Sequence, residues 1–278
     1  MKLSIITINL NNKAGLLRTL ASVESQVDRQ FEHVIVDGAS TDGSVEVIKE
    51  YAARHDNVRW ISEPDTGIYN AMNKAARMAT ADYLLYINSG DELHDSGVVK
   101  KFNKLECDED LLLGEEMSVN IEQNRQIRVR FTLFEGESSL MTFYTGAPHQ
   151  AVFIKRLLQL KIPYDESYRI AGDYHFFLKV AINNDCRIGT IDLCVSNWHV
   201  GGVSTLRDTT TEMNRAQKEL LPKRIFTDYK GLTKDGLQLL KRLSKYDGFR
   251  KFVLSFADRL VDCYSVYQRI IKSVLVRK

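Results

Sequence analysis

Along the first hundred positions, short apolar runs alternate with segments in which apolar residues recur at helical spacing. This pattern predicts that strands alternate with helices. Short apolar runs rich in β-branched residues predict strands over Leu3–Ile8, His33–Val36, Val58–Ile61 and Tyr83–Ile87. Between these runs, apolar residues at helical spacing predict helices over Asn12–Val23, Ser44–Ala53 and Ile68–Met78. Strands that alternate with helices of this length are typical of β-α-β units around a parallel sheet.

Beyond residue 105 the pattern becomes mixed. It predicts further strands over Asp110–Gly114, Ile127–Phe131 and Cys186–Ile191, and a polar turn at Glu122-Gln123-Asn124. A helix is predicted over Asp173–Ile182, with Phe176, Phe177 and Val180 facing the core. The sequence therefore predicts an α/β protein in which parallel units come first and a mixed α+β half follows.

From Thr211 onward the pattern is helical, and its last part is amphipathic. Apolar residues recur on one side of Phe249–Val276, while the opposite side carries arginines and lysines. Between Leu232 and Lys278, eleven Lys or Arg residues stand against four Asp or Glu, although the whole chain has a formal charge of only +2. Two arrangements stay open: the segment packs on its own domain, or its basic face lies on an anionic membrane surface.

Composition and charge exclude several classes of protein. The 278 residues, 44% hydrophobic and 27% charged, are typical of a globular chain rather than a disordered one. The charge is too balanced for a general nucleic-acid-binding surface, so no nucleic-acid partner is expected. Four cysteines without a C-x-x-C pair predict neither a zinc site nor a disulfide framework, and reduced thiols fit a cytoplasmic protein. No run of eighteen apolar residues occurs, so we expect no membrane-spanning helix.

The expected strands end in polar residues at one edge of the sheet. Right-handed crossovers place the carboxyl ends of parallel strands at the same edge, where open α/β sheets bind ligands. The first strand ends in Thr7-Ile8-Asn9 and the second in Val36-Asp37. Asp37 either accepts hydrogen bonds from a base or ribose, or stabilises an Asx-type turn. The first loop contains no G-x-G-x-x-G, so a dinucleotide site of the dehydrogenase type is not expected.

Two further junctions are rich in polar groups. The third junction, residues 62–74, carries Asp65, Asn70 and Asn73 where a helix starts, and the unpaired N–H groups of a helix N-terminus attract anions. Asn70 and Asn73 are poor helix formers three positions apart on one face, which indicates a role other than helix formation. The fourth strand ends in Asn88-Ser89-Gly90-Asp91-Glu92, and carboxylates beside an amide and a hydroxyl suit Mg²⁺ or Mn²⁺.

The order of these motifs resembles a known family. The chain contains Ile-Thr-Ile-Asn, Val-Asp-Gly-Ala-Ser-Thr-Asp-Gly-Ser, Glu-Pro-Asp-Thr-Gly-Ile-Tyr-Asn-Ala-Met-Asn-Lys and Tyr-Ile-Asn-Ser-Gly-Asp-Glu, and then Pro148–Phe153, Ala171–Phe177 and Gly201–Ser204. Residues 1 to 205 resemble glycosyltransferase family 2, and within it the bacterial exopolysaccharide enzymes of the colanic-acid type. The resemblance implies a GT-A (Rossmann-like) fold, a mixed sheet flanked by helices, over residues 1–210. A helical, basic and amphipathic C-terminal extension is expected over residues 211–278.

The resemblance assigns the sheet edge to a nucleotide-sugar donor. The implied nucleotide-binding residues are Thr7, Asn9, Asp37, Asp65, Asn70, Asn73 and Asn88. Among them, Asp37 is implied to accept from uracil or ribose, and Asn88 to lie beside the ribose or phosphate. Asp91 occupies the acidic position of the family's D-x-D signature and is implied to bind Mn²⁺ or Mg²⁺. Because asparagine and glycine stand where acids are common, His199 is the candidate for a second metal ligand.

The same resemblance implies where the chemistry takes place. Asp173 matches the family's catalytic base, which takes the proton from the attacking acceptor hydroxyl while the nucleoside diphosphate departs in line. Its place before the predicted helix is also that of an N-cap. His149 and Gln150 match positions near the donor sugar or diphosphate, and a structural role is the alternative for His149. Trp198, beside His199, either stacks on a sugar ring or packs in the core.

The function that the resemblance implies is an inverting, metal-dependent glycosyltransferase in surface polysaccharide synthesis. The enzyme moves a sugar from a nucleotide-diphosphate sugar to a saccharide acceptor, expected to be lipid-linked and reached from the cytoplasmic face of the membrane. The alternative is a catalytically weak nucleotide-sugar-binding subunit of a polysaccharide assembly complex, which the reduced acid signature supports. A nucleotidyl transferase is disfavoured, because Asn9-Leu10-Asn11-Asn12 replaces the glycine-rich basic first loop of such enzymes.

Overall fold

The computed structural model describes residues 2–120, 125–129, 143, 147–182, 185–199 and 208–223. Four predicted features lie outside these residues: the polar turn at 122–124, the end of the strand predicted to reach Phe131, the glycine pair at 201–202 and the amphipathic segment 249–276. The extension predicted over 211–278 is described only as far as Lys223. The division of the chain into a domain over residues 1–210 and an extension over residues 211–278 therefore stays a prediction.

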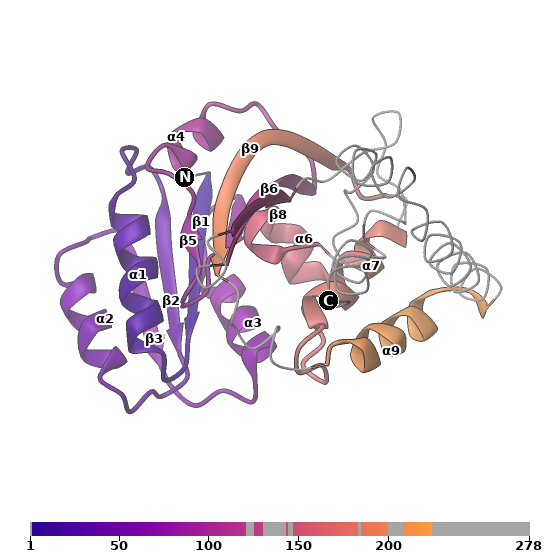
Figure 1. Cartoon of the computed structure of the whole chain (residues 1–278), viewed down its shortest axis with the longest axis horizontal. Coiled ribbons are helices and arrows are strands. Elements are labelled where there is room, and N and C mark those ends of the chain that lie inside the picture. Colours follow the sequence, from indigo (N-terminus) through magenta and orange to yellow (C-terminus); the bar gives the residue numbers. More distant parts are fainter. Residues whose placement is uncertain are drawn as a thin grey trace, which may run out of the picture.

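The first half of the chain forms the predicted alternation of strands and helices (Figure 1). Its strands are β1 (Leu3–Asn9), β2 (Glu32–Asp37), β3 (Val58–Ser62) and β4 (Tyr83–Tyr86). The helices between them are α1 (Lys13–Glu24), α2 (Ser44–Ala52) and α3 (Ile68–Met78). Each boundary lies within one residue of its prediction, because the apolar runs here are regular and separated by clear turn residues.

The second half departs further from the sequence pattern. Its elements are β5 (Glu92–Leu93), α4 (Val98–Asn103), β6 (Leu111–Asn120), β7 (Arg125–Val129), the 3-10 turn η1 (His149–Ala151), β8 (Val152–Lys155), α6 (Arg156–Lys161), α7 (Gly172–Ile182), β9 (Ile188–His199) and α9 (Thr210–Leu220). The strand predicted to end at Gly114 continues to Asn120, and the strand predicted over Cys186–Ile191 continues to His199. These two strands pair with each other, with Glu116 opposite Ser196. This tertiary pairing makes a strand of a polar segment whose own sequence does not predict one.

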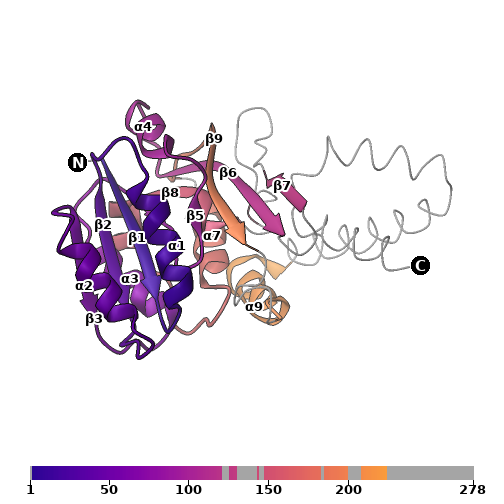
Figure 2. The ribbon, with the colours of Figure 1, turned by 60° about the vertical axis from the view of Figure 1, so that its left-hand side comes forward.

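The strands of the described residues join one mixed sheet, in the order β3-β2-β1-β4-β8-β6-β9-β5, with β7 paired to β6. The strands β1, β2, β3 and β4 are parallel, whereas β8 is antiparallel to both β4 and β6. In Figure 2 the parallel half lies at one end of the molecule, and β6, β7 and β9 extend beyond it. The predicted fold class, an α/β mixed sheet flanked by helices, is confirmed.

Helices cover both faces of the sheet. On one face, α1 and α2 bury Leu16, Leu20 and Ile48 against Ile35 of β2, and α4 packs nearby through Phe102. On the other face, α3, α6 and α7 contribute to the largest apolar cluster, together with the opposite sides of β1, β2 and β4. Phe176, Phe177 and Val180 of α7 are buried there, as predicted. The two apolar layers fix the ends of the strands, from which the site is built.

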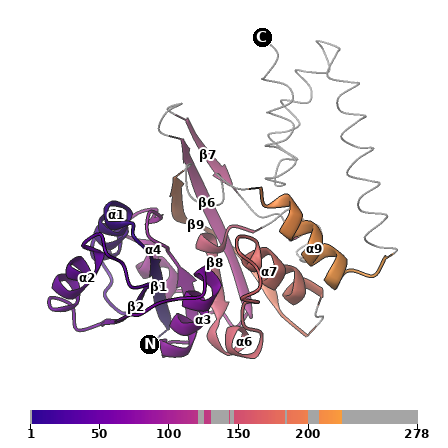
Figure 3. The ribbon, with the colours of Figure 1, turned by 90° about the horizontal axis from the view of Figure 1, so that it is seen from below.

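The helix α9 packs on α7. Figures 1 and 3 show the two helices side by side, and Ala216 and Leu221 are buried in the cluster that also contains Phe176 and Val180. The first turns of the predicted extension are therefore part of the core. No helix among the described residues is both long and apolar enough to cross a membrane.

Candidate active site

Polar side chains gather at the carboxyl ends of β1, β2 and β4, beside η1 and the start of α7. The parallel register sets Asn9 opposite Asp37, so the ends of β1 and β2 lie side by side. The loop after β4 reaches the same place, because the backbone N–H of Ser89 donates to the Ile8 carbonyl at 3.1 Å. A continuous set of contacts then leads from Asp37 to Asp173.

Asp37 is fully buried at the end of β2 and uses both carboxylate oxygens. Its Oδ1 accepts from the Ser40 hydroxyl at 2.6 Å and from Asn9 Nδ2 at 2.7 Å. Its Oδ2 accepts from the Ser40 N–H at 2.9 Å and from the Ser62 hydroxyl at 2.7 Å. Burial by itself raises the pKa of Asp37, but the hydrogen bonds from Ser40, Asn9 and Ser62 lower it overall. The structure thus has the Asx-type turn, while the contact of Asp37 with a nucleoside stays a prediction.

Asn9 and Thr7 both lie on β1 but have different surroundings. Asn9 Oδ1 accepts from the Ser89 hydroxyl at 2.8 Å, which joins β1 to the loop after β4. The Thr7 hydroxyl is fully buried, donates to the Ile87 carbonyl at 2.8 Å and lies 3.0 Å from His33 Nε2. Thr7 therefore ties β1 to the end of β4 from inside the fold, and its contact with a nucleoside stays a prediction.

Asp65, Asn70 and Asn73 hold the junction between β3 and α3. Asp65 Oδ1 lies 2.7 Å from Lys74 Nζ. The side-chain amides of Asn70 and Asn73 donate to the Glu166 carboxylate at 2.9 and 3.0 Å. These two asparagines thus fasten a loop from far along the chain to α3, which is a role other than helix formation. Their contact with a nucleotide stays a prediction.

The loop after β4 turns at Gly90, whose φ of +111° is a left-handed conformation that favours glycine. Thr19 of α1 holds this turn: its hydroxyl accepts from the Gly90 N–H at 3.0 Å and donates to the Asp91 carbonyl at 2.7 Å. The left-handed backbone conformation at residue 90 therefore explains why glycine occupies a position of the D-x-D signature where acids are common. At the start of the loop, Asn88 Nδ2 lies 3.1 Å from His149 Nε2.

Two carboxyl groups with raised pKa values lie near one another beside this loop. Burial raises the pKa of Asp91 to about 6, against the opposing charges of His149 and His199. Glu116 of β6 is 2% exposed, and burial together with the Asp91 charge raises its pKa to about 8. Within the described part of the chain, Glu116 Oε2 has no hydrogen-bond partner. Perturbed acids of this kind are typical of functional sites.

His199 approaches the same region from the end of β9. Its Nε2 lies 2.6 Å from Glu92 Oε2, and its buried Nδ1 has no hydrogen-bond partner among the described residues. Those residues contain no group of three or more His, Cys, Asp or Glu side chains that could hold a metal ion. That Asp91 and His199 bind a metal ion stays a prediction.

Asp173 lies in the first turn of α7 and is contacted on both carboxylate oxygens. Its Oδ2 lies 2.9 Å from His149 Nδ1, and its Oδ1 accepts from the Tyr174 N–H at 2.9 Å and lies 3.0 Å from the Tyr69 hydroxyl. Burial lowers the pKa of His149, but the hydrogen bond and charge of Asp173, with the Asp91 charge, raise it overall. Because α7 begins at Gly172, Asp173 stands inside the helix rather than at its N-cap.

Gln150 and Trp198 are the other residues with a predicted place near the donor or a sugar ring. Gln150 follows His149 in η1 and is buried, whereas Trp198 is half-buried near the end of β9. Their contacts with a sugar, like that of His149, stay predictions.

The sequence patterns did not single out three residues that shape the site, namely Tyr69, Glu116 and Glu166. Tyr69 stands beside Asn70 in the polar third junction, and this position next to a candidate site residue could have indicated that Tyr69 belongs to the site. Glu166 contacts asparagines far away in the sequence, and Glu116 is buried near the charge of Asp91, which is also distant in the sequence. Spacing alone does not reveal such neighbours.

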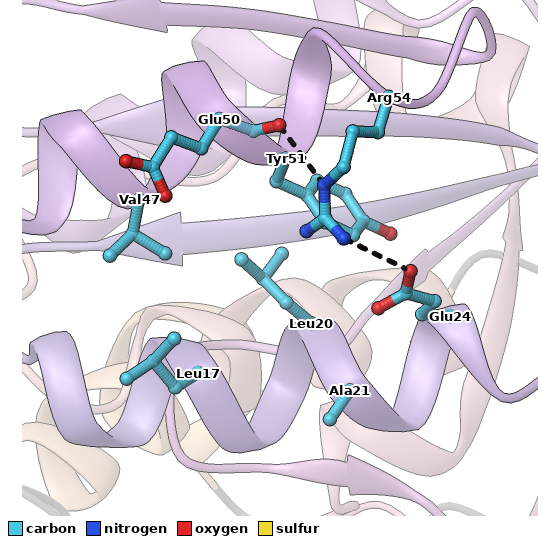
Figure 4. A pocket seen from close by; sticks show the side chains of 8 residues that line it. All are labelled: Leu17, Leu20, Ala21, Glu24, Val47, Glu50, Tyr51 and Arg54. Atoms are coloured by element: carbon cyan, nitrogen blue, oxygen red, sulfur yellow. Dashed lines mark hydrogen bonds and ion pairs between the residues drawn. The ribbon is translucent and has the colours of Figure 1, made fainter.

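A hollow of about 220 Å³ lies elsewhere, between α1 and α2 (Figure 4). Leu17, Leu20 and Tyr51 line it, and Arg54, just beyond the end of α2, points toward Glu24 of α1, with a nitrogen-to-oxygen distance of 3.7 Å. None of the predicted site residues lines this hollow. We therefore place the candidate active site at the strand ends and not here.

Comparison with solved structures identifies the fold. TarS of S. aureus, solved in complex with UDP-GlcNAc, matches with a TM-score of 0.64 at 19% identity, over 99% of this chain and 82% of that one. The mannosyltransferase PcManGT from Pyrobaculum calidifontis, solved with GDP-Man and Mn²⁺, matches with a TM-score of 0.55 at 15% identity, over 100% of this chain and 88% of that one. The predicted GT-A type of fold is confirmed.

Sequence comparison identifies the family. The family model described as glycosyl transferase family 2 matches residues 4–171. An uncharacterized glycosyltransferase of Mycobacterium tuberculosis is 33% identical, over 74% of this chain and 78% of its own length. A PGL/p-HBAD biosynthesis glycosyltransferase of Mycobacterium bovis is 30% identical, over 72% of this chain and 78% of its own length. These relatives support the family rather than its colanic-acid type, and the chain belongs to glycosyl transferase family 2.

Proposed function

We propose that this glycosyltransferase inverts the anomeric centre of a sugar donated by a nucleotide-diphosphate sugar, with Asp173 as the general base. The observation that carries the proposal is the line of contacts from Asp173 through His149 to Asn88, 2.9 and 3.1 Å long. It sets the acid of α7 beside the loop that carries Asp91. A base and a donor-binding loop must lie this close together if a sugar is to react between them.

The proposed chemistry requires one proton transfer and one displacement. The acceptor hydroxyl oxygen bonds to the anomeric carbon, the bond from that carbon to the diphosphate oxygen breaks, and Asp173 takes the hydroxyl proton. Attack from the face opposite the leaving group inverts the centre. His149 and the Tyr174 N–H hold the Asp173 carboxylate in one orientation for this step.

The donor is proposed to lie along the ends of β1 and β2, with Asp37 and Asn9 beside its nucleoside and His149 and Gln150 beside its sugar or diphosphate. The ligands of TarS, UDP-GlcNAc, and of PcManGT, GDP-Man with Mn²⁺, support a donor of this class. We propose Asp91 and His199 as ligands of Mn²⁺ or Mg²⁺. When bound, such a cation offsets the charge that develops on the departing diphosphate.

The acceptor is proposed to be a saccharide, lipid-linked and reached at the cytoplasmic face of the membrane. Two observations support it. A relative is named for PGL/p-HBAD biosynthesis, and the sequence of residues 249–276 is basic and amphipathic. The product would then belong to a surface polysaccharide or glycolipid.

The first experiment separates donor binding from turnover. Thermal unfolding is followed with UDP, GDP, UDP-GlcNAc and GDP-Man, each with Mn²⁺ or with EDTA, since a bound ligand raises the melting temperature by mass action. Release of UDP or GDP is then measured with the stabilising donor and a panel of saccharides. We expect one nucleotide to stabilise the protein, and more so with Mn²⁺.

Asp173→Asn tests the base. Turnover is expected to fall by about 10³-fold or more, while nucleotide affinity changes by less than about threefold. Asp192→Asn, at an acid whose side chain is 91% exposed on β9, is the control and should leave both values unchanged. Unchanged turnover in Asp173→Asn would contradict the proposal. Nucleotide binding without turnover of any donor by the unaltered protein would favour the alternative, a binding subunit of an assembly complex.

A further inference from the structure

Glu212 of α9 makes an unusual set of contacts with the segment that precedes α7. Its Oε1 accepts from the backbone N–H of Arg169 at 2.8 Å, and its Oε2 accepts from those of Ile170 and Ala171 at 2.9 and 2.8 Å. Three successive N–H groups thus converge on one carboxylate. Burial by itself raises the pKa of Glu212, but the three backbone hydrogen bonds lower it overall, so the group is held as an anion.

The same segment is fixed from its other side by Tyr69. The Tyr69 hydroxyl lies 2.6 Å from the Ile170 carbonyl oxygen and 3.0 Å from Asp173 Oδ1. The Ile170 carbonyl and the Ala171 N–H belong to a single peptide unit. One side of this unit therefore donates to Glu212, and the other side accepts from Tyr69.

An N–H group that donates to an anion makes the carbonyl of its own peptide unit a stronger acceptor, because hydrogen bonds in a chain polarise one another. Tyr69 has one hydroxyl proton and two acceptors within reach. Glu212 thereby favours donation to Ile170, at the shorter distance, and leaves Asp173 Oδ1 free of that proton. Asp173 is then available to accept a proton from another hydroxyl.

The rest of α9 holds Glu212 in place. Gln217 Nε2 donates to the Tyr174 hydroxyl at 2.7 Å in the buried contact between the two helices. The Arg215 guanidinium lies 4.3 Å from the centre of the Tyr168 ring and donates to the Ser167 hydroxyl at 2.8 Å. Because α9 is fastened at several points, the Glu212 carboxylate has a fixed position relative to the start of α7.

We infer that Glu212 is a positioning residue for the transfer reaction, which acts on Asp173 through the Ile170–Ala171 peptide and Tyr69. This inference rests on the proposed function, in which Asp173 is the base. It gives α9 a part in catalysis although no residue of α9 touches Asp173 in the contacts described above.

The test compares Glu212→Gln with Glu219→Gln, a matched change on the same helix that weakens the contacts with Tyr168 and Arg215 and leaves the partner of the three N–H groups intact. An amide offers a single acceptor oxygen, so Glu212→Gln leaves at least one of the three N–H groups without its partner. We expect kcat to fall about tenfold with the donor KM within about twofold, because the loss is in the reaction step and not in donor binding. Glu219→Gln should keep kcat within about twofold.

A double-mutant cycle distinguishes action through Tyr69 from general loosening of the fold. In a Tyr69→Phe background, Glu212→Gln should lower kcat by less than about twofold, since the group that transmits its effect is absent. Equal losses in both backgrounds would overturn the inference, and so would a loss in Glu219→Gln as large as that in Glu212→Gln. Restoration of most of the activity by Glu212→Asp, which keeps the charge, would support it.

Hydrogen exchange gives a readout that does not depend on activity. The N–H groups of residues 169–171 should exchange slowly in the unaltered protein and faster in Glu212→Gln, while α9 stays protected. Slow exchange of these groups in the variant would overturn the inference. If Asp173→Asn retains turnover, the proposed function fails. If Asp173→Asn loses turnover while Glu212→Gln keeps it, only the present inference fails.

Discussion

The ring of Tyr69 lies directly against the backbone of Gly172. A Cβ at residue 172 would come within 2.7 Å of Tyr69 Cδ2 and Cε2, which is closer than carbon atoms pack. The ring cannot easily move aside, because Tyr69 is buried and its hydroxyl lies 2.6 Å from the Ile170 carbonyl oxygen. The glycine at the start of α7 is therefore part of the arrangement that holds Asp173.

Gly172→Ala should destabilise the protein by about 1–3 kcal/mol, the usual effect of forcing an extra methyl group into a packed site. Urea unfolding measures this change in the free energy of unfolding. Gly97→Ala is the control, since its new Cβ would lie 3.2 Å from the nearest atom, an oxygen of the exposed side chain of Asp95. Equal stability of Gly172→Ala and the unaltered protein would show that Tyr69 shifts at little cost.

His149 links stability to pH through its contact with Asp173. The hydrogen bond and charge of Asp173 raise the pKa of His149 above 6.5 despite its burial. A pKa that is higher in the folded state than in the unfolded state stabilises the fold fully below pH 6.5. This contribution is lost as the pH rises through the folded-state pKa.

His149→Gln should therefore lower the free energy of unfolding more at pH 5.5 than at pH 9. Chemical unfolding at several pH values measures the difference. His94→Gln is the control, because the His94 ring is held by the neutral amide oxygen of Asn197 at 2.7 Å, whereas the His149 ring is held by a carboxylate. A loss of stability in His149→Gln that is the same at both pH values would contradict the charged pair.

The parallel half of the fold could be predicted because its signals are local. The helix Ile68–Met78 has the predicted bounds, since small and apolar residues such as Met72 and Ala75 face the sheet at helical spacing. The strand β6 could not be bounded in this way. Its second half, from Glu115, owes its conformation to pairing with β9 about eighty residues later, and that pairing has no local signature.

The same distinction between local and long-range contacts holds for the candidate site. The turn formed by Asp37 and Ser40 depends on neighbours in the sequence, so the Asx-type interpretation of Asp37 was available from the sequence. The pairing of Asn70 with Glu166 spans 96 residues, and the burial of Glu116 depends on strands that meet only in the folded chain. The sequence therefore named the polar residues at the strand ends but not the partners that orient them.

Ala39 carries backbone strain in the turn after β2. Its φ of +61° is in the left-handed region, which costs a residue with a Cβ roughly 1–2 kcal/mol relative to glycine. Ala39→Gly should raise the free energy of unfolding by about 0.5–1 kcal/mol, after the greater freedom of glycine in the unfolded chain is counted. Thermal or urea unfolding measures the change.

Ala21→Gly is the control for this prediction. Ala21 is exposed in the middle of α1, where the same substitution should destabilise by about 1 kcal/mol. Opposite signs for the two variants would assign the effect to the φ value at residue 39. A loss of stability in both would show that the turn tolerates alanine without strain.

Glu116 makes the fold less stable at high pH. Burial, together with the Asp91 charge, raises its pKa to about 8, well above the usual 4.5. Between these two values the folded chain keeps a proton on Glu116 that the unfolded chain releases. The free energy of unfolding therefore falls as the pH rises from about 4.5 to about 8, and the loss is complete above the higher value.

Glu116→Gln removes this titration while it keeps the size of the side chain. The variant and the unaltered protein should have similar stability near pH 5, and the variant should be more stable by at least about 2 kcal/mol near pH 9. Urea unfolding in buffers with EDTA measures both. Glu115→Gln, at the neighbouring residue that is ion-paired with Arg128, keeps Glu116 and should therefore keep the decline with pH. Parallel pH profiles for Glu116→Gln and the unaltered protein would mean that Glu116 is ionised in the fold, with a cation or water near its Oε2.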